Sequence, residues 1–152
     1  MQEVAVKIKF ITPCLGNVRR DDYDRFERDS SGAIIFMSSW WREILQYGAQ
    51  AFGKHQKLIH NVRMHARIEG GVKRYKRYYS ATRYTEHEAF LKDDAIIVKA
   101  MLPTGLPPDD FKEIFRLAGN YRGMSPYGWQ DGFGQFETID VTPVIRRHGS
   151  KT

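Results

Sequence analysis

The segment from residue 95 to residue 119, AIIVKAMLPTGLPPDDFKEIFRLAG, carries the clearest structural signals in the chain. Its first eight residues are rich in isoleucine and valine and predict a strand over residues 95–102. Pro107 and Pro108 favour the first turn of a helix, and the two aspartates after them suit the positive end of its dipole. Gly119 is expected to end this helix. The helix should bury the stripe formed by Phe111, Ile114, Phe115 and Ala118.

The chain upstream of this segment predicts another strand and another helix. Apolar and polar side chains alternate over residues 4–10, which indicates a half-buried strand. Ser38 or Ser39 can cap a helix that should end at Gly53. Between them, residues 16–32 are polar and highly charged, which predicts a long surface loop. Residues 33–37 are interpreted as a short extra strand.

The middle and the end of the chain complete the predicted order of elements. Residues 62–68 alternate like a strand, Gly70-Gly71 is a hairpin signal, and residues 72–84 should form the second arm. A last strand is expected over residues 135–141. The order strand, helix, strand, strand, helix, strand predicts an α+β, ferredoxin-like (βαββαβ) fold. Its antiparallel sheet should carry two helices on one face and a projecting basic β-hairpin. We expect a single domain over residues 1–145 and a basic flexible tail over residues 146–152.

Positive charge is concentrated in residues 53–83. The whole chain has 24 Lys and Arg, 18 Asp and Glu, and a net charge of +6. Residues 53–83 hold nine basic residues and one acid, Glu69, so the rest of the chain has a net charge of −2. Unbalanced like charge favours a polyanionic partner, although a solvated face is the alternative.

Within this segment, residues 73–83 read KRYKRYYSATR. Nucleic-acid grooves need cations to neutralise phosphates and planar groups to stack on bases, and this stretch offers both. The alternative is that some of the tyrosines pack within a sheet. Residues 120–136 form a glycine-rich loop whose backbone amides can approach phosphates, with Arg122 adding polar reach. These glycines are equally compatible with ordinary turns.

The run from Gly119 to Phe136, GNYRGMSPYGWQDGFGQF, resembles the C-terminal glycine-rich loop of the RAMP superfamily, the CRISPR-associated RNA-binding proteins. In that family a similar loop follows the second helix and ends in Gly-hydrophobic-Gly, as Gly132-Phe133-Gly134 does. The segment 29–45 also resembles the one in which RAMP backbone subunits present their first helix. The start KFITPCLG, residues 9–16, is similar to that of small phage-encoded RAMP-like proteins. The resemblance implies a ferredoxin-like fold and an RNA ligand.

Together these features give a set of expected contact residues. Nucleic acid should be bound by Lys54, Lys57, Arg63, His65, Arg67, Lys73, Arg74, Tyr75, Lys76, Arg77, Tyr79, Arg83, Arg122, Gly132 and Gly134. His60 and His65 are candidates for a general base of metal-independent RNA cleavage, or are simply polar contacts. No cofactor and no metal site are expected, since Cys14 is the lone cysteine. One of the adjacent Trp40 and Trp41 is expected to be exposed or at an interface, which favours self-association or a protein partner.

Three functions remain open at this point. The first is a single-stranded RNA- or DNA-binding protein of phage or mobile-element origin that oligomerises along the strand. The second is a metal-independent endoribonuclease acting through a histidine. The third is an anti-defence protein that mimics or binds a CRISPR complex subunit. The expected partners are single-stranded nucleic acid and either further copies or a CRISPR-type protein complex. No apolar run is long enough for a membrane span, so a cytoplasmic protein is expected, in a bacterial or phage-infected cell.

Overall fold

The computed structural model describes residues 1–20, 22–124 and 129–145. The predicted α+β class is confirmed, because helices and antiparallel strands both occur. The predicted tail, residues 146–152, lies outside the described residues. Along the chain the elements are β1 (Gln2–Phe10), β2 (Cys14–Leu15), β3 (Val18–Arg20), β4 (Tyr23–Arg25), β5 (Glu27–Arg28), β6 (Ile34–Ile35), α1 (Ser38–Phe52), η1 (Leu58–Asn61), β7 (Arg63–His65), β8 (Lys73–Tyr78), β9 (Tyr84–Phe90), β10 (Ala95–Leu102), α2 (Pro108–Tyr121), η2 (Trp129–Asp131) and β11 (Phe136–Pro143).

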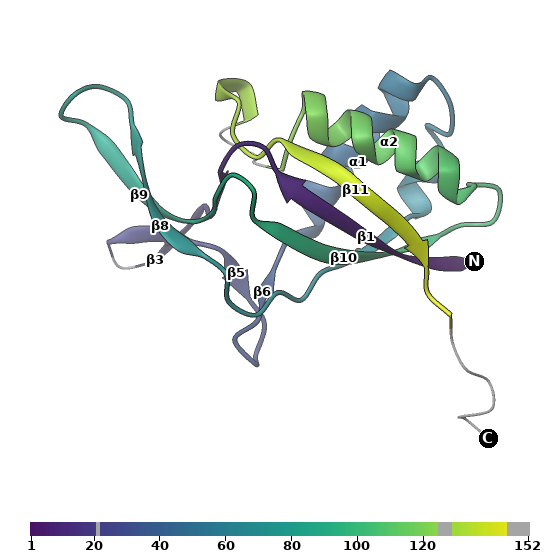
Figure 1. Cartoon of the computed structure of the whole chain (residues 1–152), viewed down its shortest axis with the longest axis horizontal. Coiled ribbons are helices and arrows are strands. Elements are labelled where there is room, and N and C mark those ends of the chain that lie inside the picture. The colour runs from purple at the N-terminus through teal and green to yellow at the C-terminus, as the bar shows by residue number, and fades with distance from the viewer. Residues whose placement is uncertain (21, 125–128, 146–152) are drawn as a thin grey trace.

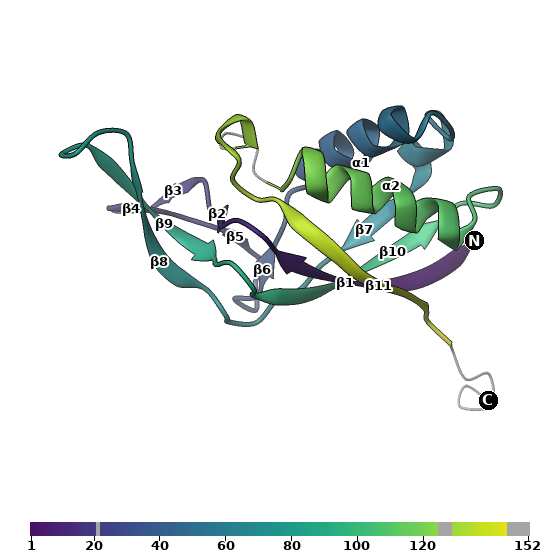
Figure 2. The same cartoon turned by 45° about the horizontal axis from the view of Figure 1, so that its top comes forward.

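The helix-covered sheet consists of β11, β1, β10 and β7 in that order, and neighbouring strands are antiparallel. Both α-helices lie against one face of this sheet (Figures 1 and 2). The alternation predicted over residues 4–10 is real, because every second side chain of β1 is fully buried beneath the helices. β10 alternates in the same way and pairs with β1 along its whole length. The strand predicted over residues 95–102 is thus confirmed.

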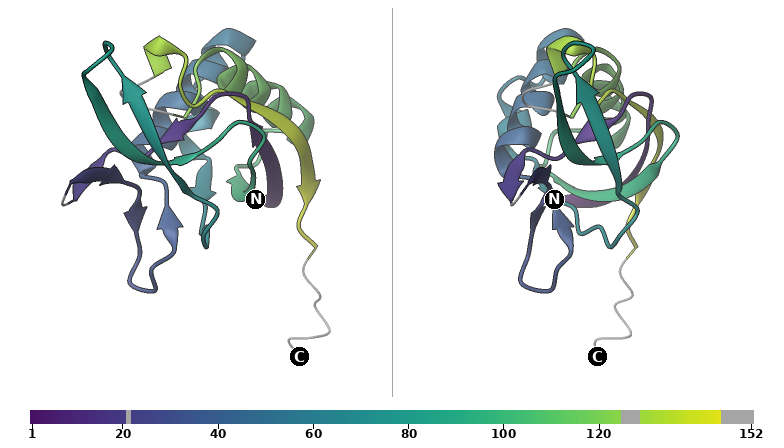
Figure 3. Two further views of the ribbon diagram at one scale, coloured as in Figure 1. Left: turned by 60° about the vertical axis from the view of Figure 1, so that its left-hand side comes forward. Right: turned by 90° about the vertical axis from the view of Figure 1, so that its left-hand side faces the viewer.

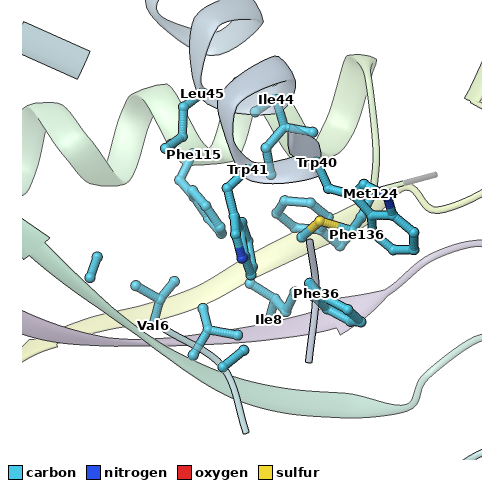
Figure 4. Packing of buried hydrophobic residues seen from close by; sticks show 14 of the residues in the cluster. Val6, Ile8, Phe36, Trp40, Trp41, Ile44, Leu45, Phe115, Met124 and Phe136 are labelled. Carbon is cyan, nitrogen blue, oxygen red and sulfur yellow. The ribbon is translucent and has the colours of Figure 1, made fainter. Parts of the chain in front are cut away.

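Both tryptophans of α1 are buried, at 4% and 5% exposure, so the prediction that one of them is exposed is wrong. The Trp40 ring stacks on Phe36 at 5.4 Å between centroids and also meets Phe26. The Trp41 ring instead packs against Phe115 of α2 (Figure 4). Adjacent side chains on α1 can both be buried because each has its own apolar partners. Phe26 and Phe36 lie beside Trp40, and Phe115 of α2 lies beside Trp41.

The ends of the helices differ in part from the prediction. Gly53 ends α1 as expected, with a positive φ of 81° and its N–H bonded to Ala49. Residue Met37, not a serine, is the N-cap, and it makes no side-chain capping bond. α2 continues through Gly119, because this glycine serves close packing rather than termination. A Cβ at Gly119 would lie 2.4 Å from the Phe136 ring of β11.

The distal sheet has five strands. β2, β9, β4 and β3 follow one another in that order, and β8 pairs with β9 as well. β8 and β9, with the loop of residues 79–83 between them, are called the ribbon. The ribbon extends away from the helix-covered sheet (Figures 1 and 3). β5 and β6 form a separate two-stranded pair.

The predicted hairpin around Gly70-Gly71 is wrong. β7, the first predicted arm, pairs with β10 in the helix-covered sheet, whereas β8 pairs with β9 in the distal sheet. The two glycines, both with positive φ, therefore carry the chain from one sheet to the other. The true hairpin turn lies at residues 79–83. This turn contains no glycine, the residue that marks most tight hairpin turns, so the sequence pattern did not predict it.

The charged segment of residues 16–32 is not simply a surface loop, since it contains β3, β4 and β5. Several of its charges are paired with side chains far away in the sequence. Arg28 donates two hydrogen bonds to Glu88 of β9, at 2.8 and 2.7 Å. Glu88 also accepts the N–H of Phe26, whose side chain is buried. Such long-range partners are invisible to a local sequence pattern.

Candidate nucleic-acid interface

Three tyrosine rings stand exposed at the end of the ribbon. Tyr78 and Tyr84 form its last cross-strand pair, with ring centroids 5.3 Å apart. Tyr78 and Tyr79 are each 58% exposed and Tyr84 is 45% exposed. The turn itself is closed by the N–H of Tyr79, which bonds to the carbonyl of Arg83 at 2.8 Å. The fold therefore presents aromatic surface to solvent that the hydrophobic effect would normally bury.

Two cations accompany these rings. The Lys76 ammonium lies 4.8 Å from the centre of the Tyr84 ring. Lys76 faces Glu86 across the ribbon, but Glu86 pairs with Arg74 instead, at 2.5 Å. Among the described residues, neither Lys76 nor Arg83 has an acidic partner, and both are exposed. We call the set Tyr78, Tyr79, Tyr84, Lys76 and Arg83 the tyrosine tip.

Other cations of the basic segment are neutralised by acids from elsewhere in the chain. Lys73 pairs with Asp94 at 3.2 Å, and Arg67 pairs with Asp29 at 3.0 Å. Asp29 accepts hydrogen bonds from Ser31, Arg67 and two backbone amides, which together hold its pKa at about 2. The net charge of +8 over residues 53–83 is therefore less exposed than the sequence alone indicates. Among the described residues, the tyrosine tip is one place where positive charge stays without an acidic partner.

The glycine-rich loop packs against one face of β8. Arg77 forms an ion pair with Asp131, and its guanidinium lies 4.9 Å from the centre of the Phe133 ring. Tyr75 meets the same ring edge-on at 6.0 Å. Tyr75 and Arg77 point to this loop because they alternate with Arg74 and Lys76 along β8. The structure thus brings together two segments that the sequence predicted separately.

Two glycines of that loop play different roles. Gly134 has a φ of +81°, and its carbonyl accepts the N–H of Met124 at 2.7 Å. A Cβ there would lie 2.7 Å from the Met124 backbone. Gly132 has a similar φ, but no atom of the described residues lies within 4 Å of where its Cβ would be. Gly134 is therefore required for packing, whereas Gly132 meets no such contact from the described part of the chain.

A further aromatic residue, which is not among the predicted contact residues, lies beside the ribbon. The Tyr23 ring of β4 lies between two guanidiniums, 3.7 Å from Arg74 and 4.3 Å from Arg25. The hydrogen bond from Arg74 to Glu86 raises the pKa of Arg74, so the stacked group stays charged. The residues 16–32 contain Tyr23 among charges, and only the pairing of β4 with β9 reveals its neighbours.

Several predicted residues lie away from the tyrosine tip. Lys54 and Lys57 are exposed in the segment between α1 and η1, and Arg63 and His65 lie on β7 at the edge of the helix-covered sheet. Arg122 is buried, and its guanidinium approaches Glu43 of α1 at 3.4 Å. Burial lowers the pKa of Arg122 below its usual value. Arg122 therefore links the end of α2 to α1, and the prediction that it contacts nucleic acid at the surface is not supported by its burial.

The histidines divide into structural and exposed ones. His55 hydrogen-bonds Asp110 at 2.8 Å, and the buried His87 bonds the carbonyl of Gly16 at 2.7 Å. His60 and His65 are exposed, and within the described part of the chain neither imidazole has a hydrogen-bond partner that would orient it. A general base is usually oriented by a third group.

The described residues hold neither a metal-binding cluster nor a membrane-spanning helix. Residues 1–20, 22–124 and 129–145 contain no cluster of three or more His, Cys, Asp or Glu side chains arranged to hold a metal ion. The helices in these ranges are all too short or too polar to cross a membrane.

Comparison with known proteins finds similarity in structure and not in sequence. No protein-family model matches the chain, and no curated protein matches it in sequence. Among solved structures, one chain of "Cryo-EM structure of the Type III-B Cmr-beta bound to cognate target RNA" superposes with a TM-score of 0.64 at 12% identity. The match covers 94% of this chain and 60% of that chain, so this protein spans less than two thirds of the longer one. The likeness concerns the fold.

Proposed function

We propose that this protein binds single-stranded nucleic acid, with the tyrosine tip as the contact surface. The observation that carries the proposal is the exposure of Tyr78, Tyr79 and Tyr84 beside two cations without acidic partners among the described residues. Bases stack on aromatic rings with little sequence preference, and cations neutralise the phosphates between them. Paired bases are already stacked on their neighbours, so a single strand is the expected ligand.

Ribonucleic acid is the favoured ligand. Strand order β11-β1-β10-β7, with α1 after the first core strand and α2 after the third, supports a ferredoxin-like fold. A structural neighbour belongs to a Type III-B Cmr-beta assembly described as bound to target RNA. Together with the glycine-rich loop ending in Gly132-Phe133-Gly134, these features support a RAMP-like protein that acts within a CRISPR-type ribonucleoprotein.

The two faces of β8 extend the proposed surface in different ways. Arg74 and Tyr23 form one stacked pair, and Arg77 and Phe133 form another on the opposite face of β8. Because Arg74 is half exposed and held by Glu86, it presents an oriented guanidinium plane at little further cost in side-chain entropy, whereas the Arg77 side chain is only 11% exposed and holds the glycine-rich loop. A strand running from the tyrosine tip toward the glycine-rich loop would meet planar groups along its path.

The direct test is the affinity for a fluorescent single-stranded oligoribonucleotide, measured by anisotropy at low salt. Replacing Tyr78 and Tyr84 by alanine should weaken binding at least tenfold, since each stacked base contributes about 1–3 kcal/mol. Tyr121→Ala is the matched control, because Tyr121 is 62% exposed but lies on α2. Equal loss in the control, or no binding by the natural protein, would rule the proposal out.

The same oligonucleotide tests the alternative of cleavage. His60 and His65 are exposed near β7, away from the ribbon, so a ribonuclease would need a second contact there. Incubation without metal followed by gel electrophoresis should leave the strand intact. Cleavage that disappears in His60→Ala or His65→Ala would identify an endoribonuclease instead.

A further inference from the structure

A second candidate site lies on the other sheet, beside α1. Its floor is apolar and aromatic, formed by the buried side chains of Phe36, Trp41, Leu45 and Ile59. The pocket encloses about 450 Å³, which is within the range of roughly 300–1,000 Å³ that holds small molecules. It opens between three elements, which are the first half of α1, the short helix η1 and the edge strand β7. The tyrosine tip contributes no residue to it.

The polar residues around this pocket are cationic or neutral. They are Ser38, Arg42, His60 and Arg63, and all four are exposed. None of the pocket's lining residues is acidic, and neither Arg42 nor Arg63 has an acidic partner within the described part of the chain. Two guanidiniums at the mouth of an apolar hollow favour a ligand that is itself part planar and apolar, part anionic.

We propose that this pocket binds a nucleotide, with the base against the floor and the phosphate at the two arginines. The floor, which Trp41 lines with the small exposed part of its ring, is apolar enough for the base, and the guanidiniums of Arg42 and Arg63 match a phosphate in charge and can each donate two hydrogen bonds to it. The nucleotide is either free or the end of a strand. An adjoining hollow of about 380 Å³ shares His60, Val62 and Arg63, and it leaves room for a chain to continue.

The site is independent of the proposed ribbon contact, and the experiment separates the two. Adenosine 5′-monophosphate, adenosine and inorganic phosphate are titrated calorimetrically into the whole chain carrying Tyr78→Ala and Tyr84→Ala. The nucleotide should bind more tightly than either of its parts. Arg42→Gln or Arg63→Gln should weaken it about tenfold, since each removes one charge-assisted contact. Lys112→Gln, an equal charge change on the exposed side of α2, should have no effect.

The indole N–H resonance of Trp41 provides a second measurement. It should shift when the nucleotide is added to the natural protein and should shift less in Arg42→Gln at the same concentration. A tetranucleotide with a 5′-phosphate then distinguishes the sources: tighter binding than the mononucleotide identifies a strand end, and equal binding identifies a free nucleotide. Equal affinity for the mononucleotide and inorganic phosphate, or an affinity unchanged in both arginine variants, would overturn the proposal and leave the ribbon untouched.

Discussion

The helix-covered sheet and the distal sheet are held together in different ways. In the first, buried apolar side chains of β1 and β10 alternate with outward ones, and α1 and α2 close over them. In the second, charged and aromatic side chains pair across long stretches of chain, as Arg28 does with Glu88 and Arg77 with Asp131. Apolar burial carries stability, whereas exposed rings and cations contribute little to it and are available to a ligand. Stability and recognition should therefore be separable by mutation.

The largest effect is expected in the helix-covered sheet. Phe115→Ala removes a fully buried ring that meets Phe111, Trp41 and Phe136, and it should lower the free energy of unfolding by about 4 kcal/mol. Urea unfolding followed by circular dichroism measures this. Tyr79→Ala in the ribbon is the comparison and should change stability by less than about 0.5 kcal/mol. Similar losses in the two variants would break the distinction between the sheets.

The next effect lies where the glycine-rich loop meets β1. Gly134→Ala combines a left-handed backbone with a Cβ 2.7 Å from the Met124 backbone, so it should cost about 3 kcal/mol. Gly132→Ala meets only the backbone strain and should cost about 1 kcal/mol. Thermal unfolding of both variants measures the difference. A Gly132 variant as unstable as the Gly134 variant would mean that the loop packs differently.

Sequence patterns were a good guide to the first sheet and a poor one to the second. The strand at residues 95–102 and the start of α2 follow from signals within a few residues, since alternation and helix-start residues are local. β9 went unpredicted because it is stabilised by β8, by β4 and by the pair of Glu88 with Arg28, and both β4 and Arg28 lie about 60 residues away in the sequence. The basic and tyrosine-rich composition of residues 73–83 predicted a contact surface there. The Gly70-Gly71 signal, however, placed the hairpin turn at the wrong residues.

Acid should weaken the distal sheet through Glu88. Burial alone would raise the pKa of Glu88, but hydrogen bonds from Arg28 and from the Phe26 N–H hold it below its usual value. A carboxyl whose folded pKa is lowered stabilises the protein above its unfolded pKa, about 4.5, and this contribution is lost as the pH falls through the folded value. Glu88→Gln should cost about 2 kcal/mol at pH 7.

The same variant supplies the pH test. Unfolding of the natural protein and of Glu88→Gln is compared at pH 7 and at pH 3.5. The difference between them should shrink in acid, because below about pH 4.5 the unfolded natural protein takes up a proton at residue 88 and the variant cannot. A difference that stays constant would mean that the pair with Arg28 contributes nothing that depends on ionisation.

The smallest effect concerns the link between the ribbon and the glycine-rich loop. Asp131→Asn removes the acid that Arg77 contacts, and because Asp131 is largely exposed the cost should stay below about 1 kcal/mol. In this variant, hydrogen exchange at the Tyr75 and Arg77 amides should become faster than in the natural protein, whereas exchange at the β1 amides should not change. Asp140→Asn, an exposed acid on β11, is the matched control. Unchanged exchange on β8 would show that Phe133 packing alone holds the ribbon in place.

The central claim is that the ribbon, and not the outward face of β1 and β10, provides the main contact with a nucleic-acid strand. The most direct measurement is the salt dependence of oligoribonucleotide affinity in two double variants. Lys76→Gln with Arg83→Gln removes the tip cations, while Lys7→Gln with Lys99→Gln removes two exposed cations from β1 and β10. The first should reduce the slope of log affinity against log salt by about 1.4, and the second should leave it unchanged. The reverse pattern would contradict the account.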